Sequence, residues 1–303
     1  MVDSGAVNIN RYQIISDANT MKSAIFYCPE SCNGKHRNDM REIVEHMKKI
    51  NADFSYLELN GETPEDIAEF CGSSDVIVIG GGDGTVNRVI NATYTMNKPY
   101  VLLPFGSGND FARSFRCPRD GEGLSETLNK MHGQTVDLWE LNENTVFVQS
   151  IFIGLSIKTI EIKNELGCNG YLKPIIKALS VYEPEHVRVS ADNETADGHY
   201  LMAAVQNVKT TCNGLKMTPS SKVDDGKLEV IVCPYVGRYR LIMNLLSTKT
   251  SWVCNQPNAT VLISDRFHIE GDGEMTYTVD GEIRKSAGLD IRLSDRKITV
   301  LSL

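Results

Sequence analysis

The chain has 303 residues, a length that suggests two domains and excludes a small disulfide scaffold. Hydrophobic residues make up 41% and charged residues 23%, as in globular proteins, and no apolar run approaches the roughly 18 residues of a membrane-spanning helix. The 39 acidic and 31 basic residues leave a net charge of -8, which disfavours nucleic acid as a partner. The eight cysteines form no C-x-x-C pair, so we expect reduced thiols in a cytoplasmic protein.

Residues 1–22 are expected to form a polar N-terminal arm. From residue 23 to 135, short apolar runs alternate with helical patterns. Met40, Ile43, Val44 and Met47, for example, form one apolar helix face. This alternation is typical of an α/β domain with a parallel, Rossmann-like sheet covered on both faces. The expected strands are 23–28, 54–59, 76–79 and 100–103, and the expected helices are 40–50, 63–72, 86–95 and 111–115.

Residues 136–303 consist of alternating, turn-rich segments, which predict a mainly antiparallel, β-sandwich-like second domain. No long linker separates the two halves, so we expect them to pack with a ligand-binding cleft between them. The expected strands are 146–153, 187–190, 200–205, 228–232, 267–269, 275–279 and 289–293, with helices near 173–179 and 240–246.

The most prominent motif is a glycine loop, Gly80-Gly81-Gly82-Asp83-Gly84, between an apolar strand and a helix. Glycines let the backbone approach an anion closely, and the N-H groups of a helix N-terminus point at it, so the loop predicts phosphate binding. The lysine of a P-loop and the G-x-G-x-x-G spacing are both missing. An acid among phosphate-binding amides fits a magnesium ion or a reacting hydroxyl between them. A tight turn without a ligand is the alternative.

A second glycine loop follows the next strand, in the segment from Pro104 to Arg113. Ser107 offers a hydroxyl to a phosphate, and Asn109 or Asp110 can cap the following helix. Adjacent parallel strands place both loops at the carboxyl edge of the sheet, where ligands bind in such folds.

The two loops, Gly81 to Thr85 and Pro104 to Arg113, together resemble the diacylglycerol kinase catalytic domain family, which includes bacterial lipid kinases and sphingosine kinases. The resemblance covers about residues 23–303. It implies an ATP-dependent kinase that phosphorylates the hydroxyl of diacylglycerol or a related lipid alcohol. In family members the last strand can return to the first domain. The similarity continues through Asn207, Asn213-Gly214, Pro219 and the segment Asp224 to Val230.

By position, the resemblance implies two kinds of site residue. Magnesium near the phosphates would involve Asp83, Asp110 and Asp137, and oxygen-only ligation of a structural magnesium ion would use the Asp225 side chain with the carbonyls of Lys222 and Lys227. Taken alone, Asp224-Asp225-Gly226 is typical of a hairpin turn. The implied nucleotide contacts are Gly81, Gly82, Asp83, Gly84, Thr85, Asn87, Gly106, Ser107, Gly108 and Asn109.

Either of two Asp-Gly-Glu tripeptides could contain the catalytic base. The one beginning at Asp280 follows an alternating strand, as the family's motif does, whereas the one beginning at Asp272 is expected to be a solvated turn. We therefore assign catalysis to Asp280 and Glu282 together with Asp83, because an acceptor hydroxyl must lose its proton in line with the phosphoryl group. Which carboxylate is the base stays open.

The sequence also departs from the family pattern. The usual N-P-x-S-G of the first nucleotide loop is Cys28 to Cys32 here, Arg88 replaces a glutamate, and the segment 154–158 lacks an aspartate. Arg113, Arg116 and Arg119 form either a solvated helix face or a patch that meets phosphates or an anionic membrane. We expect peripheral contact with a membrane that holds the lipid substrate, and a homodimer is left open.

Two other functions stay open at this point. An NAD kinase shares the G-G-D-G loop and the two-domain plan, although the segment from Pro104 to Arg113 speaks against it. A catalytically weak lipid- or nucleotide-binding relative would explain the altered first loop and Arg88, but Asp83, Asp110, Asp280 and Glu282 are all retained.

Overall fold

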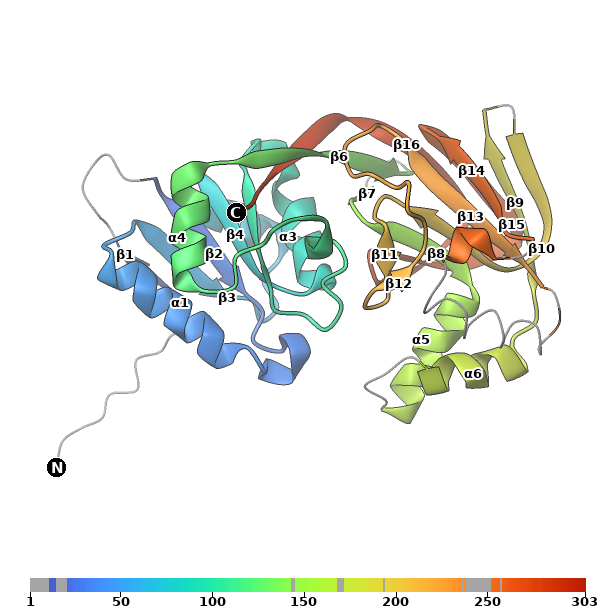
Figure 1. The fold of residues 1–303 in the computed structure, drawn as a ribbon, viewed down its shortest axis with the longest axis horizontal. Helices are drawn as coiled ribbons and strands as arrows, with labels where there is room; N and C mark the ends of the chain where they lie inside the picture. The colour runs from blue at the N-terminus through green and yellow to red at the C-terminus, as the bar shows by residue number, and fades with distance from the viewer. Residues whose placement is uncertain are drawn as a thin grey trace. The chain divides into compact units, whose positions relative to one another are not determined.

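A computed structural model describes residues 11–14, 21–142, 145–167, 172–192, 194–235, 237, 252–256 and 258–303 (Figure 1). The predicted helix at 240–246 and most of the predicted N-terminal arm lie outside the described residues. The chain divides into two compact units. Unit 1 is Met1–Thr135 with Ile298–Leu303, and unit 2 is Val136–Lys297.

Unit 1 alternates strands with helices. Strand β2 pairs in parallel with β3 and β4, and β4 pairs in parallel with β5. The chain end returns to this sheet, where Val300 and Leu301 pair in parallel with β5. The strands are β1 (Arg11–Ile14), β2 (Ser23–Tyr27), β3 (Phe54–Glu58), β4 (Val76–Gly81) and β5 (Tyr100–Pro104), and the helices are α1 (Arg37–Lys49), α2 (Pro64–Cys71), α3 (Asp83–Thr93) and α4 (Gly121–Lys130).

Helices cover both faces of this sheet. The apolar face of α1 packs with α4 against alternate strand residues such as Ile25 and Val78. On the opposite face, Phe70 of α2 contacts Phe26 of β2, with ring centroids 5.1 Å apart. Thr63 begins α2 through a capping box with Asp66, as its sequence predicts.

Three expectations for unit 1 need correction. Residues 11–14 of the predicted arm form β1, whose backbone pairs with the otherwise open edge of β3. The helix predicted at 111–115 is only a short 3-10 turn, Ala112–Ser114. Helix α4 was not predicted, because its first turn contains two glycines; Asp120 caps it by accepting the N-H of Gly123 at 2.8 Å.

Unit 2 is β-rich, as predicted, and its strands pair antiparallel in the order β16-β15-β8-β10-β13-β14, with β9 joined to β10 and β15. The strands are β6 (Gly133–Leu141), β7 (Thr145–Phe147), β8 (Ser150–Gly154), β9 (Glu185–Ala191), β10 (Glu194–Gln206), β11 (Thr210–Thr211), β12 (Leu215–Lys216), β13 (Leu228–Pro234), β14 (Thr260–Ser264), β15 (Arg266–Val279) and β16 (Glu282–Leu301), and the helices are α5 (Leu155–Leu166) and α6 (Leu172–Val181).

Two expectations for unit 2 also need correction. Residues 146–153 form two strands, β7 and β8, rather than one. Helix α5 was not predicted, because its isoleucines and threonine are β-branched and Leu155 and Ile157 alternate as in a strand. Burial against α6 and Leu201 of β10 stabilises it as a helix instead. No helix in the described parts of the chain is long and apolar enough to span a membrane.

Candidate functional site

Three loops meet at the carboxyl ends of β2, β4 and β5. The N-H of Cys28 donates to the carbonyl of Gly80 at 3.0 Å, and the N-H of Phe105 donates to that of Gly81 at 3.1 Å. The hydroxyl of Ser31 donates to the carbonyl of Phe105 at 3.0 Å. The altered first loop is thus bonded to the two glycine loops, so its departure from the family sequence leaves the loop in place.

The two glycine loops touch through their backbones. A Cβ built on Gly106 would lie 2.2 Å from the Cα of Gly82, and one built on Gly82 would lie 3.0 Å from the Cα of Gly106. A Cβ on Gly81 would lie 2.5 Å from Oγ1 of Thr85. Side chains at these positions would push the loops apart, which explains why the motif needs glycine there.

Helix α3 begins within the first glycine loop. Gly82 is its N-cap and Asp83 its first residue, so the first N-H groups of the helix have no acceptor within the helix. The aligned peptide dipoles make this end of α3 favourable for an anion. Oδ1 of Asp83 accepts the N-H of Phe111 at 3.2 Å, which joins the helix start to the second loop.

Asn109 shapes the second loop instead of capping a helix, contrary to the prediction. Its backbone is left-handed, with φ 55°. Its Oδ1 accepts the N-H of Gly106 at 2.8 Å, while Nδ2 donates to the carbonyls of Pro104 and Gly106 at 3.1 and 2.7 Å. Ser107 and Gly108 lie between these points, and Ser107 is exposed. The prediction went wrong because no full helix follows Asp110.

Asp110, Arg88 and Asn87, three further polar residues of unit 1, each contact a named partner. Asp110 is 4% exposed, and its Oδ1 lies 3.6 Å from Nε of Arg113. Arg88 donates to the carbonyl of Glu62, and its Nη2 lies 3.8 Å from Oε2 of that residue. The arginine that replaces the family's glutamate therefore joins α3 to the loop before α2. Asn87 is buried, and its Oδ1 accepts from Nδ2 of Asn91 at 2.6 Å.

In unit 2, Asp280 and Gly281 form the two-residue hairpin turn between β15 and β16, with φ 44° and 92°. The Asp280 carboxylate is buried and accepts three backbone N-H groups. Val148 donates to Oδ2 at 3.0 Å, and Gln149 and Ser150 donate to Oδ1 at 3.0 and 2.9 Å. Asp280 therefore fixes the hairpin against the segment before β8.

Glu282, by contrast, is accessible. Its side chain is 47% exposed, and its Oε2 accepts from Nη2 of Arg284 at 2.9 Å. Nη1 of Arg284 donates to Oγ1 of Thr145 at 2.8 Å, which orients the guanidinium. Glu282 is thus held at the hairpin and still open to a substrate.

The competing tripeptide is solvated, as the sequence predicted, but it lies within a strand rather than in a turn. Asp272 and Glu274 lie inside β15, where its register with β16 shifts between Glu270 and Met275. Both side chains are well exposed; Oδ1 of Asp272 lies 2.8 Å from Nδ1 of His186. The tripeptide lies in the irregular part of β15, between the residues Glu270 and Met275 that pair with β16, and the pairing of β9 with β15 ends at Gly271.

Asp137 lies in unit 2 and holds the Asp225 loop. It is fully buried, and its Oδ2 accepts the N-H of Gly226 at 2.6 Å. Its own N-H donates to the carbonyl of Val223 at 2.7 Å, and Oδ1 pairs with Nζ of Lys297 at 2.7 Å. The pair with Lys297 could not be predicted from the sequence motif, because Asp137 lies in β6 and Lys297 in β16, which are far apart along the chain.

The Asp225 loop has donors suited to magnesium. The Asp225 side chain is exposed, and its Oδ1 accepts the N-H of Lys227 at 3.1 Å. A carboxylate with the carbonyls of Lys222 and Lys227 would supply the all-oxygen ligands that magnesium takes, completed by water. Among the described residues, no cluster of three or more His, Cys, Asp or Glu side chains could hold a metal ion. Any metal must therefore use carbonyls, water or phosphate oxygens as well.

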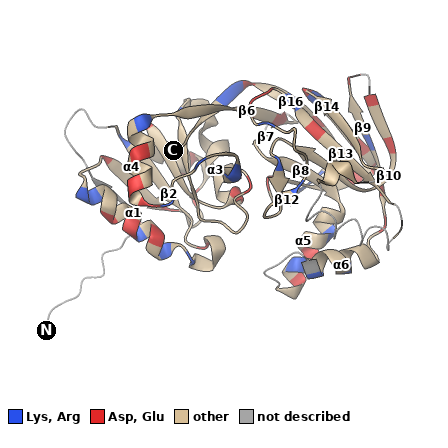
Figure 2. Cartoon of the chain, in the orientation of Figure 1, with Lys and Arg blue, Asp and Glu red and all other residues tan. Residues whose placement is uncertain are grey.

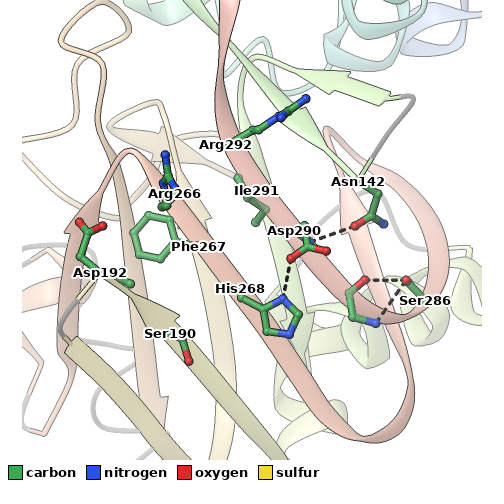
Figure 3. A pocket seen from close by; sticks show the side chains of 12 residues that line it. Asn142, Ser190, Asp192, Arg266, Phe267, His268, Ser286, Asp290, Ile291 and Arg292 are labelled. Atoms are coloured by element: carbon green, nitrogen blue, oxygen red, sulfur yellow. Dashed lines mark hydrogen bonds and ion pairs between the residues drawn. The ribbon is translucent and has the colours of Figure 1, made fainter.

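The predicted residues accordingly fall into two groups. Those of the two glycine loops come together in unit 1, whereas Asp280, Glu282, Asp137 and the Asp225 loop lie in unit 2. Unit 2 also has a hollow of about 830 Å³, lined mainly by residues of β9, β15 and β16 (Figure 3). In it, the N-H of Asp290 donates to Oδ1 of Asn142 at 2.9 Å, and Oδ1 of Asp290 lies 2.6 Å from Nδ1 of His268. None of the predicted site residues lines it.

Comparison with known proteins identifies the family. The diacylglycerol kinase catalytic domain model matches residues 22–141, and a model of the YegS C-terminal NAD kinase beta sandwich-like domain matches residues 157–302. The chain belongs to the diacylglycerol kinase catalytic domain family. It is therefore a member of a lipid kinase family, as its loops predicted.

Relatives agree with this placement. A protein of Klebsiella pneumoniae named "Probable lipid kinase YegS-like" is 27% identical over 215 residues, which cover 69% of this chain and 71% of that protein. An Escherichia coli protein named "Probable lipid kinase YegS" is 27% identical over 218 residues, covering 68% and 71%. A crystal structure named as a diacylglycerol kinase from Bacillus anthracis has a TM-score of 0.75 at 23% identity, covering 95% of this chain and 99% of that one, and shows the same fold.

Proposed function

We propose that the protein transfers the γ-phosphoryl group of ATP to the hydroxyl of diacylglycerol or a related lipid alcohol, at a membrane that it contacts peripherally. The observation that carries the proposal is the backbone contact of Gly82 with Gly106 at the N-terminus of α3. Two glycine loops in contact bring backbone N-H groups together at the helix end, and phosphates bind to such groups.

The nucleotide residues act mainly through their backbone. Gly81 to Thr85 and Gly106 to Gly108 would surround the phosphates with N-H groups and the Ser107 hydroxyl, while Asn109 keeps the second loop in shape through its bonds to Gly106. Asn87 is buried beneath the helix start and would support the loop rather than contact the nucleotide directly.

Magnesium fits two places in the proposal. Near the phosphates, Asp83 and Asp110 would hold it through oxygen ligands and water, and when bound it would neutralise charge on the phosphoryl oxygens. At the Asp225 loop, the carboxylate with the carbonyls of Lys222 and Lys227 would hold an ion that stiffens the loop. Asp137 fixes that loop through Gly226 in unit 2, and we assign it this positioning role.

For the base we choose Glu282. The lipid hydroxyl oxygen attacks the γ-phosphorus, the bond to the β-γ bridging oxygen breaks, and ADP leaves, while the hydroxyl proton passes to the Glu282 carboxylate. Its half exposure and its bond to Arg284 support this role. Asp280 is a positioning residue, because three N-H groups already occupy its carboxylate.

A transfer assay tests the function. Radiolabelled ATP is supplied with magnesium and a panel of lipids in mixed micelles, with NAD as a further acceptor. We expect label in a lipid alcohol, reduced at least a hundredfold by Asp83→Ala and by Glu282→Gln, but not by Glu274→Gln. Label in NAD alone would establish an NAD kinase, and no label in any acceptor would favour a binding protein without kinase activity.

A further inference from the structure

Helices α5 and α6 pack side by side in unit 2 around a small apolar core of their own (Figure 1). Ala178 and Leu179 of α6 are buried against Leu155 and Ile162 of α5 and Leu201 of β10. The inner face of α6 therefore packs within unit 2, and only its outer face could contact another molecule.

The outer face of α6 is not the polar surface expected of a solvated helix. Ile176 is 46% exposed and Val181 is 53% exposed, and two lysines lie beside them. Because these residues recur every three or four positions, they form one continuous stripe. Between positions 173 and 181, the exposed residues of α6 are Lys173, Ile176, Lys177, Ser180 and Val181.

Charge distinguishes this face from the exposed C-terminal end of helix α1. Helix α6 contains two lysines and no acidic residue, so the charge on its outer face is basic (Figure 2). The next acidic residue along the chain is Glu183, two residues beyond the helix. Helix α1 provides a contrast. Its C-terminal end also exposes a lysine and an isoleucine, Lys49 and Ile50, but Glu42 and Glu45 share that surface.

We propose that the outer face of α6 is the surface by which this protein lies on an anionic lipid bilayer. Ile176 and Val181 would enter the boundary between headgroups and acyl chains, and Lys173 and Lys177 would extend to the lipid phosphates. The inference rests on the proposed function, since a kinase with a lipid substrate must reach the membrane that contains it.

The expected binding is reversible. A lysine near an anionic surface strengthens binding about fivefold, and half-burying an aliphatic side chain strengthens it by a similar factor. Four such residues give a weak attachment that permits release after turnover.

Sedimentation with vesicles tests the surface without ATP. Phosphatidylcholine vesicles, with and without phosphatidylglycerol, are mixed with the full chain, with K173E/K177E, with I176S/V181S, and with K49E/I50S as the matched control on α1. We expect the wild type and the control to bind the anionic vesicles alike, both less at high salt. Each α6 variant should bind at least tenfold more weakly.

Three sedimentation results would overturn the proposal: no binding of the wild type to anionic vesicles, unchanged binding of both α6 variants, or an equal loss of binding in the α1 control. A concentration-dependent dimer in light scattering that I176S/V181S abolishes would also overturn it, assigning the face to a second copy. Turnover of a short-chain diacylglycerol in free solution separates the two claims. The α6 variants should keep that activity, and if the wild type itself lacks it, the kinase function fails while vesicle binding still decides the surface.

Discussion

Gly82 and Gly106, which come from different loops, approach so closely that a methyl group on Gly106 would lie 2.2 Å from the Cα of Gly82. Two carbon atoms that are not bonded to each other cannot come so close, so the spacing of the two loops depends on Gly106 having no side chain. Because Asp83 and the start of α3 follow Gly82 directly, this contact also sets where the helix N-terminus lies relative to Ser107 and Gly108.

Substitution of Gly106 is therefore expected to damage both stability and nucleotide binding. We predict that G106A lowers the free energy of unfolding by about 1–3 kcal/mol, as other overpacking changes do, and weakens ATP binding at least tenfold. Gly84 is the matched control, since its added Cβ meets nothing within 4 Å. G84A should leave stability unchanged or raise it by about 0.5 kcal/mol. Denaturant unfolding and titration with ATP measure the two effects.

Asp280 and Glu282 should respond in opposite ways. D280N replaces one N-H acceptor of a buried carboxylate with an amide donor, and we expect about 1–3 kcal/mol less stability. E282Q changes an exposed group, so the unfolding midpoint should stay the same while turnover is lost. Thermal unfolding paired with single-turnover rates separates these effects. A stable D280N protein with no turnover, alongside an active E282Q, would reverse the assignment of the base.

Magnesium is expected to stabilise unit 2 through the Asp225 loop. The wild type should unfold at a higher temperature with magnesium than with a chelator, and D225N should lose this difference. D224N, a change of the neighbouring exposed acid, is the control and should retain it. Scanning calorimetry over a range of magnesium concentrations measures the shift. An identical magnesium response in D225N and wild type would exclude Asp225 as a ligand.

Stability should also fall as the pH rises above neutrality. Nδ1 of His268 lies 2.6 Å from Oδ1 of Asp290, and this bond raises the pKa of His268 above its ordinary 6.5. The protonated ring stabilises the folded chain fully below pH 6.5, and the contribution is lost as the pH rises through the raised pKa. The pKa of His186 is raised as well, chiefly by its hydrogen bond to Asp197. Protonated His186 therefore also stabilises the folded chain at low pH, and this contribution too is lost as the pH rises.

The pH effect can be assigned to one pair. Unfolding free energies measured between about pH 6 and 9 should decline for the wild type, and D290N should flatten the decline because the His268 bond is lost. D295N removes another exposed acid of β16 and should leave the slope unchanged. A slope that is equal in D290N and wild type would remove His268 from the explanation.

The nucleotide loops could be predicted because their chemistry is local. The segment from Gly80 to Gly84 joins a buried strand to a helix within a few residues. The sequence alone therefore shows that the backbone there is flexible and that a helix begins there. The α/β pattern of residues 23–103 is similarly local, since each apolar stripe follows from the helical or strand period. Even α2 begins at the Thr63 cap that its sequence predicts.

What the sequence by itself determined is thus the family, the two glycine loops and the identity of the candidate acids. The tertiary structure decided their surroundings. Asp280 is buried under three N-H groups and Glu282 is exposed beside Arg284, although both belong to one tripeptide, and this difference is the basis of the roles proposed for them. The partners of Asp280 lie about 130 residues earlier in the chain and those of Asp137 up to 160 later. Such distant pairings depend on how strands assemble into sheets, which no local pattern of residues records.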